Sequence, residues 1–287
     1  MTPRAQHGTP DGDATLAIQR LARETGGDVQ ELQTLYVLEA LLARIAASEH
    51  RDDFVLKGGV LLAAFAARRP TKDIDLQATG MSNDAAEVVE RIRVLTAIHL
   101  MDGVMFDAGS VVASAIRDGD ADEYAGVRVR LVGVLGRARL TVGIDVNFGD
   151  PIWPAPRLIE IPRIVPLGQP SITLLGYPLT MVLAEKIVTA VDRGESNTRW
   201  RDFADVFTLI REQPIDMADL RASMEVVAAY RGVALAPLLP ALAAMPVRAQ
   251  PKWRAWRTRV HRERDLPERF ADVLDVVAAF ADPALAT

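Results

Sequence analysis

The feature that most restricts the fold of this chain is a short stretch, Thr71-Lys72-Asp73-Ile74-Asp75-Leu76, in which acidic and apolar residues alternate. Such alternation is typical of a β-strand, whose successive side chains point to opposite faces of a sheet. Asp73 and Asp75 therefore share one face, while Ile74 and Leu76 face a core. Two carboxylates over an apolar face suit a divalent metal, although an isolated Asp-x-Asp strand is also typical of a solvated sheet edge.

Two neighbouring segments favour the metal site. Gly58 and Gly59 lie between a short apolar strand and an apolar run, where a backbone without Cβ atoms can approach a phosphate closely. Asp145 is a lone acid in a second strand-like segment, Gly143 to Val146. The spacing between Gly59 and Asp73 accommodates one helix and a return into the sheet. We therefore expect three carboxylates and a glycine turn at one site.

The sequence predicts an α+β fold, in which a first half of mixed helices and strands is followed by a helical second half. The sequence predicts a flexible tail at 1–27, an α+β core at 28–170 and a helical domain at 171–287. Alternating or apolar runs predict strands at 54–56, 71–79, 104–116, 127–135 and 139–148, the last two joined as a hairpin near Gly136. Helical periodicity predicts helices at 28–50, 60–67, 82–100, 179–193, 199–211, 216–230, 251–264 and 267–281.

Composition excludes several classes of protein. There is no cysteine, so neither a disulfide framework nor a thiolate zinc site can form. The longest apolar run, Val60 to Ala67, is far short of the roughly 20 residues needed to cross a bilayer, and the first residues lack the apolar core of a secretory signal. We expect a cytoplasmic protein without membrane contact. The net charge is −5, yet eight basic and three acidic residues lie between Pro246 and Phe270, which predicts a local basic surface.

The segments Lys57-Gly58-Gly59, Asp73-Ile74-Asp75-Leu76 and Ile144-Asp145-Val146, in this order and spacing, resemble the nucleotidyltransferase superfamily typified by DNA polymerase β. The resemblance implies a polymerase β-type core in which Asp73 and Asp75 bind two Mg²⁺ ions. It also implies that Asp145 binds one ion and helps to deprotonate the attacking hydroxyl. The nucleoside triphosphate would lie at Gly58 and Gly59. Many relatives carry serine where this chain has Gly59, so main-chain N–H groups and a lysine would hold the phosphates instead.

Further segments look like the AbiEii-like and MenT-like nucleotidyltransferase toxins of bacterial toxin–antitoxin systems. They are Lys57 to Leu61, Arg69 to Lys72, Leu183 to Ile187 and Arg199 to Asp205, and the resemblance covers roughly residues 30–215. It implies catalytic roles for Lys186, near the triphosphate, and for Asp202. Other interpretations stay open: Lys186 could pair with Glu185 or Asp202, Arg199 could pair with Asp202, and Lys57 could contact phosphate or only the surface.

The resembling toxins transfer nucleotides, in some cases pyrimidines, to RNA such as the acceptor end of tRNA, which blocks translation. The basic segment agrees with an RNA acceptor, because Arg254, Arg257 and Arg259 could bind phosphates. Trp253 and Trp256 have the spacing of a buried helix stripe and are expected in the core, although tryptophans can also stack on bases.

The resemblance also implies an antitoxin partner, in certain cases a kinase that modifies a residue two positions before the first metal-binding Asp. Thr71 occupies that position, and strand alternation would place its hydroxyl on the face of Asp73 and Asp75. Its plainer interpretation is a residue that favours β-structure. Two other functions are open: transfer to a small molecule or protein, and a catalytically silent nucleotide-binding regulator. The intact set of three acids argues against the second.

Overall fold

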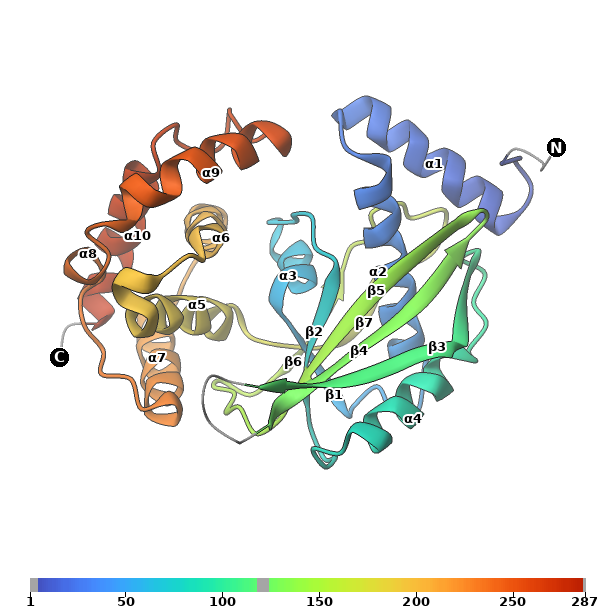
Figure 1. Ribbon diagram of the computed structural model, residues 1–287, viewed down its shortest axis with the longest axis horizontal. Coiled ribbons are helices and arrows are strands. Elements are labelled where there is room, and N and C mark those ends of the chain that lie inside the picture. The colour runs from blue at the N-terminus through green and yellow to red at the C-terminus, as the bar shows by residue number, and fades with distance from the viewer. Residues whose placement is uncertain (1–4, 118–123, 286–287) are drawn as a thin grey trace. The chain divides into compact units, whose positions relative to one another are not determined.

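The computed structural model describes residues 5–117 and 124–285, and its chain divides into two compact units (Figure 1). The first unit comprises Met1–Ala64, Arg68–Gly149 and Arg157–Gly176. The second comprises Phe65–Ala67, Asp150–Pro156 and Tyr177–Thr287. The α+β fold class predicted from the sequence is confirmed.

A mixed sheet forms the centre of the first unit. Across the described residues it has seven strands in the order β3-β4-β5-β2-β1-β7-β6. The pairs β2–β5 and β1–β7 are parallel and the other pairs are antiparallel. The strands are β1 (Phe54–Lys57), β2 (Asp73–Ala78), β3 (Val104–Arg117), β4 (Tyr124–Leu135), β5 (Ala138–Asn147), β6 (Arg157–Ile161) and β7 (Ile172–Gly176).

Two helices, α2 (Val29–Ala47) and α4 (Ala85–Thr96), pack on the sheet and on each other. As predicted, α2 begins after Asp28, whose side chain accepts a hydrogen bond of 2.8 Å from the backbone N–H of Glu31. On β4 the side chains of alternate residues are buried (Val127, Val129 and Leu131). The residues between them therefore point to the opposite face of the sheet.

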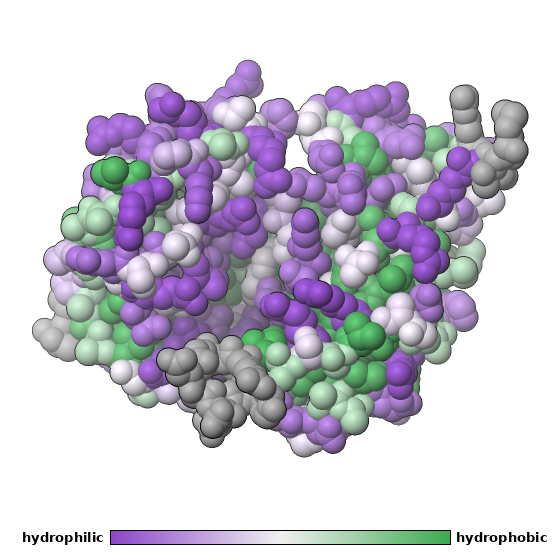
Figure 2. Space-filling model, in the orientation of Figure 1, coloured by the Kyte–Doolittle hydropathy of each residue, from purple (hydrophilic) through white to green (hydrophobic). Residues whose placement is uncertain are grey.

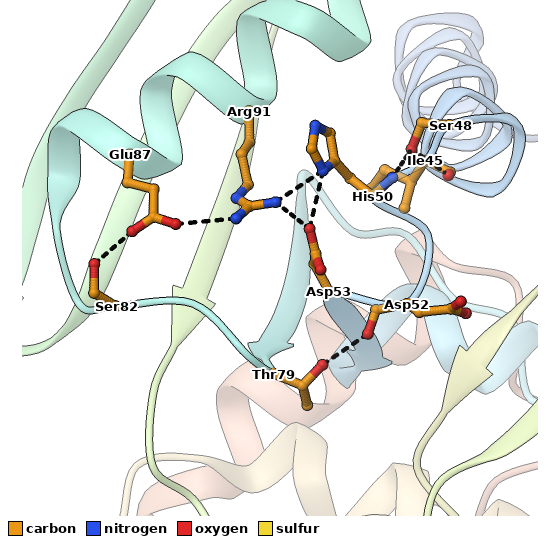
Figure 3. A network of polar contacts seen from close by, with 9 residues as sticks. All are labelled: Ile45, Ser48, His50, Asp52, Asp53, Thr79, Ser82, Glu87 and Arg91. Carbon is orange, nitrogen blue, oxygen red and sulfur yellow. Dashed lines mark hydrogen bonds and ion pairs between the residues drawn. The ribbon is translucent and has the colours of Figure 1, made fainter.

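Buried and half-buried ion pairs fix these helices. The guanidinium of Arg44 on α2 donates to both carboxylate oxygens of Asp102, at 2.7 and 3.2 Å, and both side chains are almost completely buried. Arg91 on α4 bonds to Asp53, just before β1, and to Glu87 (Figure 3). The start of β1 is thus tied to the helix that covers the sheet.

The predicted flexible tail at 1–27 is wrong for its described part. Residues Pro10–Thr25 form a helix, α1, which packs on α2 through apolar residues that include Ile18. The ends of this helix carry residues that are also typical of loops: Pro10 is in the first turn and Gly26 is a left-handed C-cap. Thr9 caps the helix by accepting from the N–H of Gly12 at 3.2 Å.

The second unit is helical, with α5 (Leu179–Arg193), α6 (Trp200–Glu212), α7 (Met217–Arg231), α8 (Leu238–Ala241), α9 (Met245–Arg259) and α10 (Phe270–Leu285). It begins at Tyr177 rather than at 171, because 172–176 form β7 of the sheet. Edge-to-face aromatic contacts join Trp200 of α6 to Trp253 and Trp256 of α9. In the described part of the chain, we find no helix with the length and apolar character needed to cross a membrane.

Two predicted helices of the first unit are shorter than expected. The helix after Gly59 was predicted over 60–67, but α3 spans only Gly58–Leu61 and continues as a 3₁₀ turn, η1, over Leu62–Phe65. The helix predicted over 82–100 begins after Asp84, whose carboxylate caps the N–H of Ala86 at 2.8 Å, while Ser82 bonds to Glu87 instead.

Candidate active site

The parallel pairing of β2 with β5 brings the three predicted carboxylates together. Its register places Asp75 directly opposite Asp145 and Asp73 opposite Gly143. Directly opposed residues of paired strands share a face of the sheet. Asp73, Asp75 and Asp145 therefore form one acidic group, called here the carboxylate triad, on the face opposite to the buried side chains Ile74 and Leu76.

Two glycines make room for the triad. A Cβ atom at Gly143 would overlap the carboxylate of Asp73, and one at Gly58 would overlap the carboxylate of Asp75. Gly58 also has a φ of +67°, which side-chain-bearing residues rarely adopt. The N–H of Gly59 donates to Oδ2 of Asp75 at 3.4 Å. The glycine turn after β1 thus lies directly against the triad.

Burial and the charge of Asp145 disfavour the ionised forms of Asp75 and Asp73. Burial, and then the charge of Asp145, raise the pKa of Asp75 to about 6. The same two causes, in the same order, raise the pKa of Asp73. Each of these carboxylates is therefore more costly to ionise than in water, and a bound cation would remove that cost.

Arg128 on β4 provides one counter-charge that the sequence did not reveal. It lies directly opposite Asp145, and its Nε and Nη2 donate to Oδ1 and Oδ2 of Asp145 at 2.7 and 2.6 Å. The hydrogen bonds that Arg128 donates to Asp145, and the negative charge of that carboxylate, raise the pKa of Arg128. Within the described ranges, no three acidic or histidine side chains are arranged as they stand so that together they could hold a metal ion. Both carboxylate oxygens of Asp145 accept hydrogen bonds from Arg128 instead. Only the register of the hairpin could have predicted this pair.

Lys57 and Thr71 lie beside the glycine turn. Lys57 is buried at the end of β1 and is paired in register with Asp75. The prediction that Thr71 belongs to the metal-binding strand is wrong, because β2 begins only at Asp73. Thr71 precedes the strand, donates to the backbone oxygen of Asp73 at 3.2 Å, and would lie 3.1 Å from a Cβ placed on Gly59. Its hydroxyl therefore adjoins the turn instead of sharing the strand face.

A separate ionic cluster occurs in the second unit. Lys186 of α5 donates to Asp202 at 2.9 Å and to Asp205 at 2.8 Å, and Arg199 donates to Asp202 at 2.5 Å. Burial alone would raise the pKa of Asp202, but the charges of Lys186 and Arg199 outweigh it and lower the pKa to about 2. The pairings of Lys186 and Arg199 with Asp202, which the sequence left open as alternatives to functional roles, are present, whereas the contact with Asp205 was not considered.

Comparison with known proteins identifies the family. The model of the family described as "Nucleotidyl transferase AbiEii toxin, Type IV TA system" matches residues 40–276, which is most of the chain. The chain belongs to this family. It is therefore a nucleotidyltransferase toxin of a toxin–antitoxin system. A comparison with curated proteins finds no match.

Solved structures agree on the fold of this AbiEii family member. JHP933 from Helicobacter pylori is similar with a TM-score of 0.54 and 15% identity, over 90% of this chain and 94% of that one. MenT4, a nucleotidyltransferase toxin from Mycobacterium tuberculosis, is similar with a TM-score of 0.52 and 19% identity, over 94% of this chain and 98% of that one. At such identities the likeness supports the fold alone.

The basic segment of this AbiEii family member forms α9 and the turn after it. Trp253 and Trp256 are buried, as expected for core residues. Arg254 and Arg259 are exposed, whereas Arg257 is half-buried. The buried Nε and Nη1 of Arg257 have no hydrogen-bond partner among the residues that the structure describes. Leaving buried donors unsatisfied costs about 1–3 kcal/mol, which an anionic ligand would relieve.

The burial of Asp75 and the charge of Asp145 beside it generate a stability prediction for the metal-free protein. Because the pKa of Asp75 is about 6 in the folded state and near 3.8 when unfolded, folding is favoured as the pH falls through 6 toward 4. Asp75→Asn should remove this dependence and raise the free energy of unfolding at pH 7.5 by about 2 kcal/mol. Urea unfolding in EDTA at pH 5 and 7.5 measures both effects.

Asp145→Asn is the matched control, since it deprives Arg128 of its partner. It should bring no comparable gain. Equal stabilisation by both substitutions, or none by Asp75→Asn, would contradict the account of the triad as a strained anionic group.

Proposed function

We propose that this toxin transfers a nucleoside monophosphate, derived from a pyrimidine triphosphate, to RNA, with the acceptor end of tRNA as the substrate. The carboxylate triad is the observation that carries the proposal. A terminal hydroxyl oxygen of the RNA attacks the α-phosphorus, the bond from that phosphorus to the bridging oxygen breaks, and pyrophosphate leaves. Asp145 accepts the proton of the attacking hydroxyl, and the product is a new phosphodiester.

The triad suits Mg²⁺ as the metal. Its donors are all carboxylate oxygens, which hard divalent ions prefer. The bonds from Arg128 use one lone pair of each Asp145 oxygen, and each oxygen retains another for a metal. When bound, two Mg²⁺ ions held by Asp73, Asp75 and Asp145 would stabilise charge on the attacking and leaving oxygens.

The glycine turn and its neighbours are proposed to bind the triphosphate. Gly58 and Gly59 bring the backbone within reach of the triad, and Lys57 supplies a positive charge opposite Asp75. Because α3 is only four residues long, its dipole contributes less than a full helix would, so backbone N–H groups and Lys57 carry this role. Thr71 adds a hydroxyl beside Gly59.

Lys186 and Asp202 are proposed to act on the nucleotide as well. Asp202 and Asp205 hold the ammonium group of Lys186 by two hydrogen bonds. A compact, oriented cation of this kind suits the β- and γ-phosphates of a triphosphate. In this proposal Asp202 and Asp205 position Lys186 and keep it protonated, while Arg199 offsets part of their charge.

The arginines of α9 are proposed to contact RNA outside the triad. Arg254 and Arg259 expose their side chains, and Arg257 carries unsatisfied donors. Guanidinium groups bind phosphates in a bidentate manner, and such contacts position a nucleic acid without reading its sequence. The buried tryptophans of α9 hold the helix and are not available for stacking on bases.

The proposed activity predicts that purified protein with Mg²⁺ labels RNA from one class of triphosphate. Asp73→Ala and Asp75→Ala should each reduce transfer by at least a hundredfold with unchanged folding, because each removes a metal ligand. Glu160→Ala, which removes an exposed acid of β6 in the same sheet, is the matched control and should transfer normally. The assay incubates each labelled triphosphate with total RNA and counts label in RNA, protein and small molecules.

Label in a small molecule or in protein, with none in RNA, would reject the RNA acceptor and leave the enzyme class intact. Near-normal turnover of either Asp variant would reject the triad itself.

We also propose that the antitoxin silences the enzyme as a kinase, through phosphorylation of Thr71. A phosphate there would add about −1.5 to −2 charges beside Gly59 and the triad, where the triphosphate is proposed to bind. After co-expression with its antitoxin, the intact protein should gain the mass of one phosphate at Thr71 and lose transfer activity. A Thr71→Val variant should keep, in the same co-expression, whatever activity it shows when it is expressed alone. If Thr71→Val is silenced as fully as the wild type, modification of this hydroxyl is not the mechanism.

A further inference from the structure

A single row of residues crosses four strands of the sheet on the triad face. The register pairs Arg128 of β4 with Asp145 of β5, Asp145 with Asp75 of β2, and Asp75 with Lys57 of β1. Directly opposed residues share a face, so the row consists of two acids in the middle with one cation at each end. With strands about 4.8 Å apart, the two acids separate the two cations by roughly 14 Å of sheet. Arg128 therefore lies on the side of the triad away from Lys57 and the glycine turn.

Arg130 extends this positive end by a second residue. It is two positions from Arg128 on β4 and hence on the same face, about 6.5–7 Å away at Cα. The residues opposite it are Gly143 on β5 and Val112 on β3, neither of which is acidic. Arg130 is exposed and makes no hydrogen bond or ion pair within the described residues. Its charge partly offsets the raised pKa of Asp73 across Gly143, and its exposed guanidinium keeps N–H groups that can bind an anionic ligand.

Arg128 also has N–H groups that its bonds to Asp145 do not use. Its bonds to Asp145 use one N–H from Nε and one from Nη2, which leaves three of the five guanidinium N–H groups. The side chain is 43% exposed, whereas that of Asp145 is 15% exposed. Arg128 can therefore hold Asp145 and a phosphate at the same time.

We propose that Arg128 and Arg130 bind the phosphodiester backbone of the acceptor strand and so present its terminal hydroxyl to Asp145. This inference rests on the proposed transfer to RNA and adds the subsite through which the acceptor enters. The triphosphate approaches from the Lys57 side of the row and the acceptor from the Arg128 side, with the acids between them. Two phosphate contacts two residues apart fix the register of the strand without reading its bases.

The open face of β3 and β4 leaves room for such a strand. On β3, Val112 is 60% exposed beside Arg130, and Ser114, opposite Arg128, is also exposed. In the view of Figure 2 the surface over β4 and β5 carries hydrophilic residues next to apolar ones. Single-stranded nucleic acid suits a surface that combines backbone charge contacts with apolar area for its bases.

A matched control arginine occurs on the same hairpin. Arg139 lies on β5 four residues before Gly143 and therefore on the same face as Arg130. It lies toward the far end of the strand and already pairs with Asp107 of β3 at 3.4 Å. Loss of its charge lowers the net charge by as much as loss of Arg130, but it is not part of the proposed subsite.

The test measures the affinity of fluorescein-labelled, unfractionated tRNA for the full chain by anisotropy over a series of KCl concentrations. Arg130→Gln and Arg128→Gln should each weaken binding several-fold and reduce the slope of log K against log[KCl] by about 0.7, the value for one lost contact to a single strand. Arg139→Gln should have the slope of the wild type. In calorimetry with a non-hydrolysable pyrimidine triphosphate, Arg130→Gln should bind as tightly as the wild type.

The outcomes separate this inference from the function on which it rests. Wild-type protein that binds no tRNA overturns both. Wild-type binding with the same slope for Arg130→Gln and Arg139→Gln overturns the subsite alone, as does a loss of triphosphate affinity in Arg130→Gln with tRNA binding unchanged. Replacement of Arg254, Arg257 and Arg259 together by Gln measures the α9 surface in the same assay, and an unchanged slope there rejects its proposed RNA contact.

Discussion

The repulsion among three carboxylates is the constraint on which the rest of the first unit depends. The parallel pairing of β2 with β5 places Asp75 opposite Asp145, with Asp73 two residues away, and burial, followed by the charge of Asp145, makes Asp73 and Asp75 more costly to ionise. A chain relaxes such strain by exposing the acids, by neutralising them or by binding a cation. Here β2 and β5 are central in the sheet, so exposure is incomplete: Asp73 is exposed at the start of β2, but Asp75 is half-buried. The site must instead be compensated from its two sides.

Two features compensate the crowded carboxylates: glycines that leave space for them, and positively charged side chains on either side. Gly58 and Gly143 leave the space that the carboxylates occupy, and neither position tolerates a Cβ. Arg128 binds Asp145 on one side, and Lys57 faces Asp75 on the other. Beneath them α2 is fixed by the buried pair Arg44–Asp102, whose loss would leave an uncompensated buried charge. The first unit thus holds its acidic group on packed strands and helices, an arrangement that suits the pre-organised site that we propose.

Much of this site could be predicted from the sequence because it depends on local patterns. The alternation around Asp73 and Asp75 fixes a strand and a face, and glycines followed by an apolar run predict a turn. Arg128 and Gly143 could not be recognised in the same way, since their roles arise from the register between strands distant in sequence. Helix α1 was missed because the proline and glycines at its ends are also typical of loops, and β7 because prolines precede it.

The ionic cluster of the second unit shows the same limit. The spacing of Arg199 and Asp202 on one helix left their contact open, and Lys186 with Asp202 was another open pairing. Asp205 lies one turn beyond Asp202 on α6, yet only packing of α5 against α6 reveals that it shares the ammonium group of Lys186. Family membership establishes a nucleotidyltransferase toxin, and the arrangement of these residues supplies the chemical detail that we propose for it.

The most direct test of the central claim, that the triad holds two divalent ions, is anomalous diffraction from crystals grown with Mn²⁺ and a non-hydrolysable pyrimidine triphosphate. The account predicts two manganese peaks, about 3.5–4 Å apart, bound by oxygens of Asp73, Asp75 and Asp145. The triphosphate should lie against Gly58 and Gly59. Crystals that contain the triphosphate and manganese but show no peak at these carboxylates would contradict it.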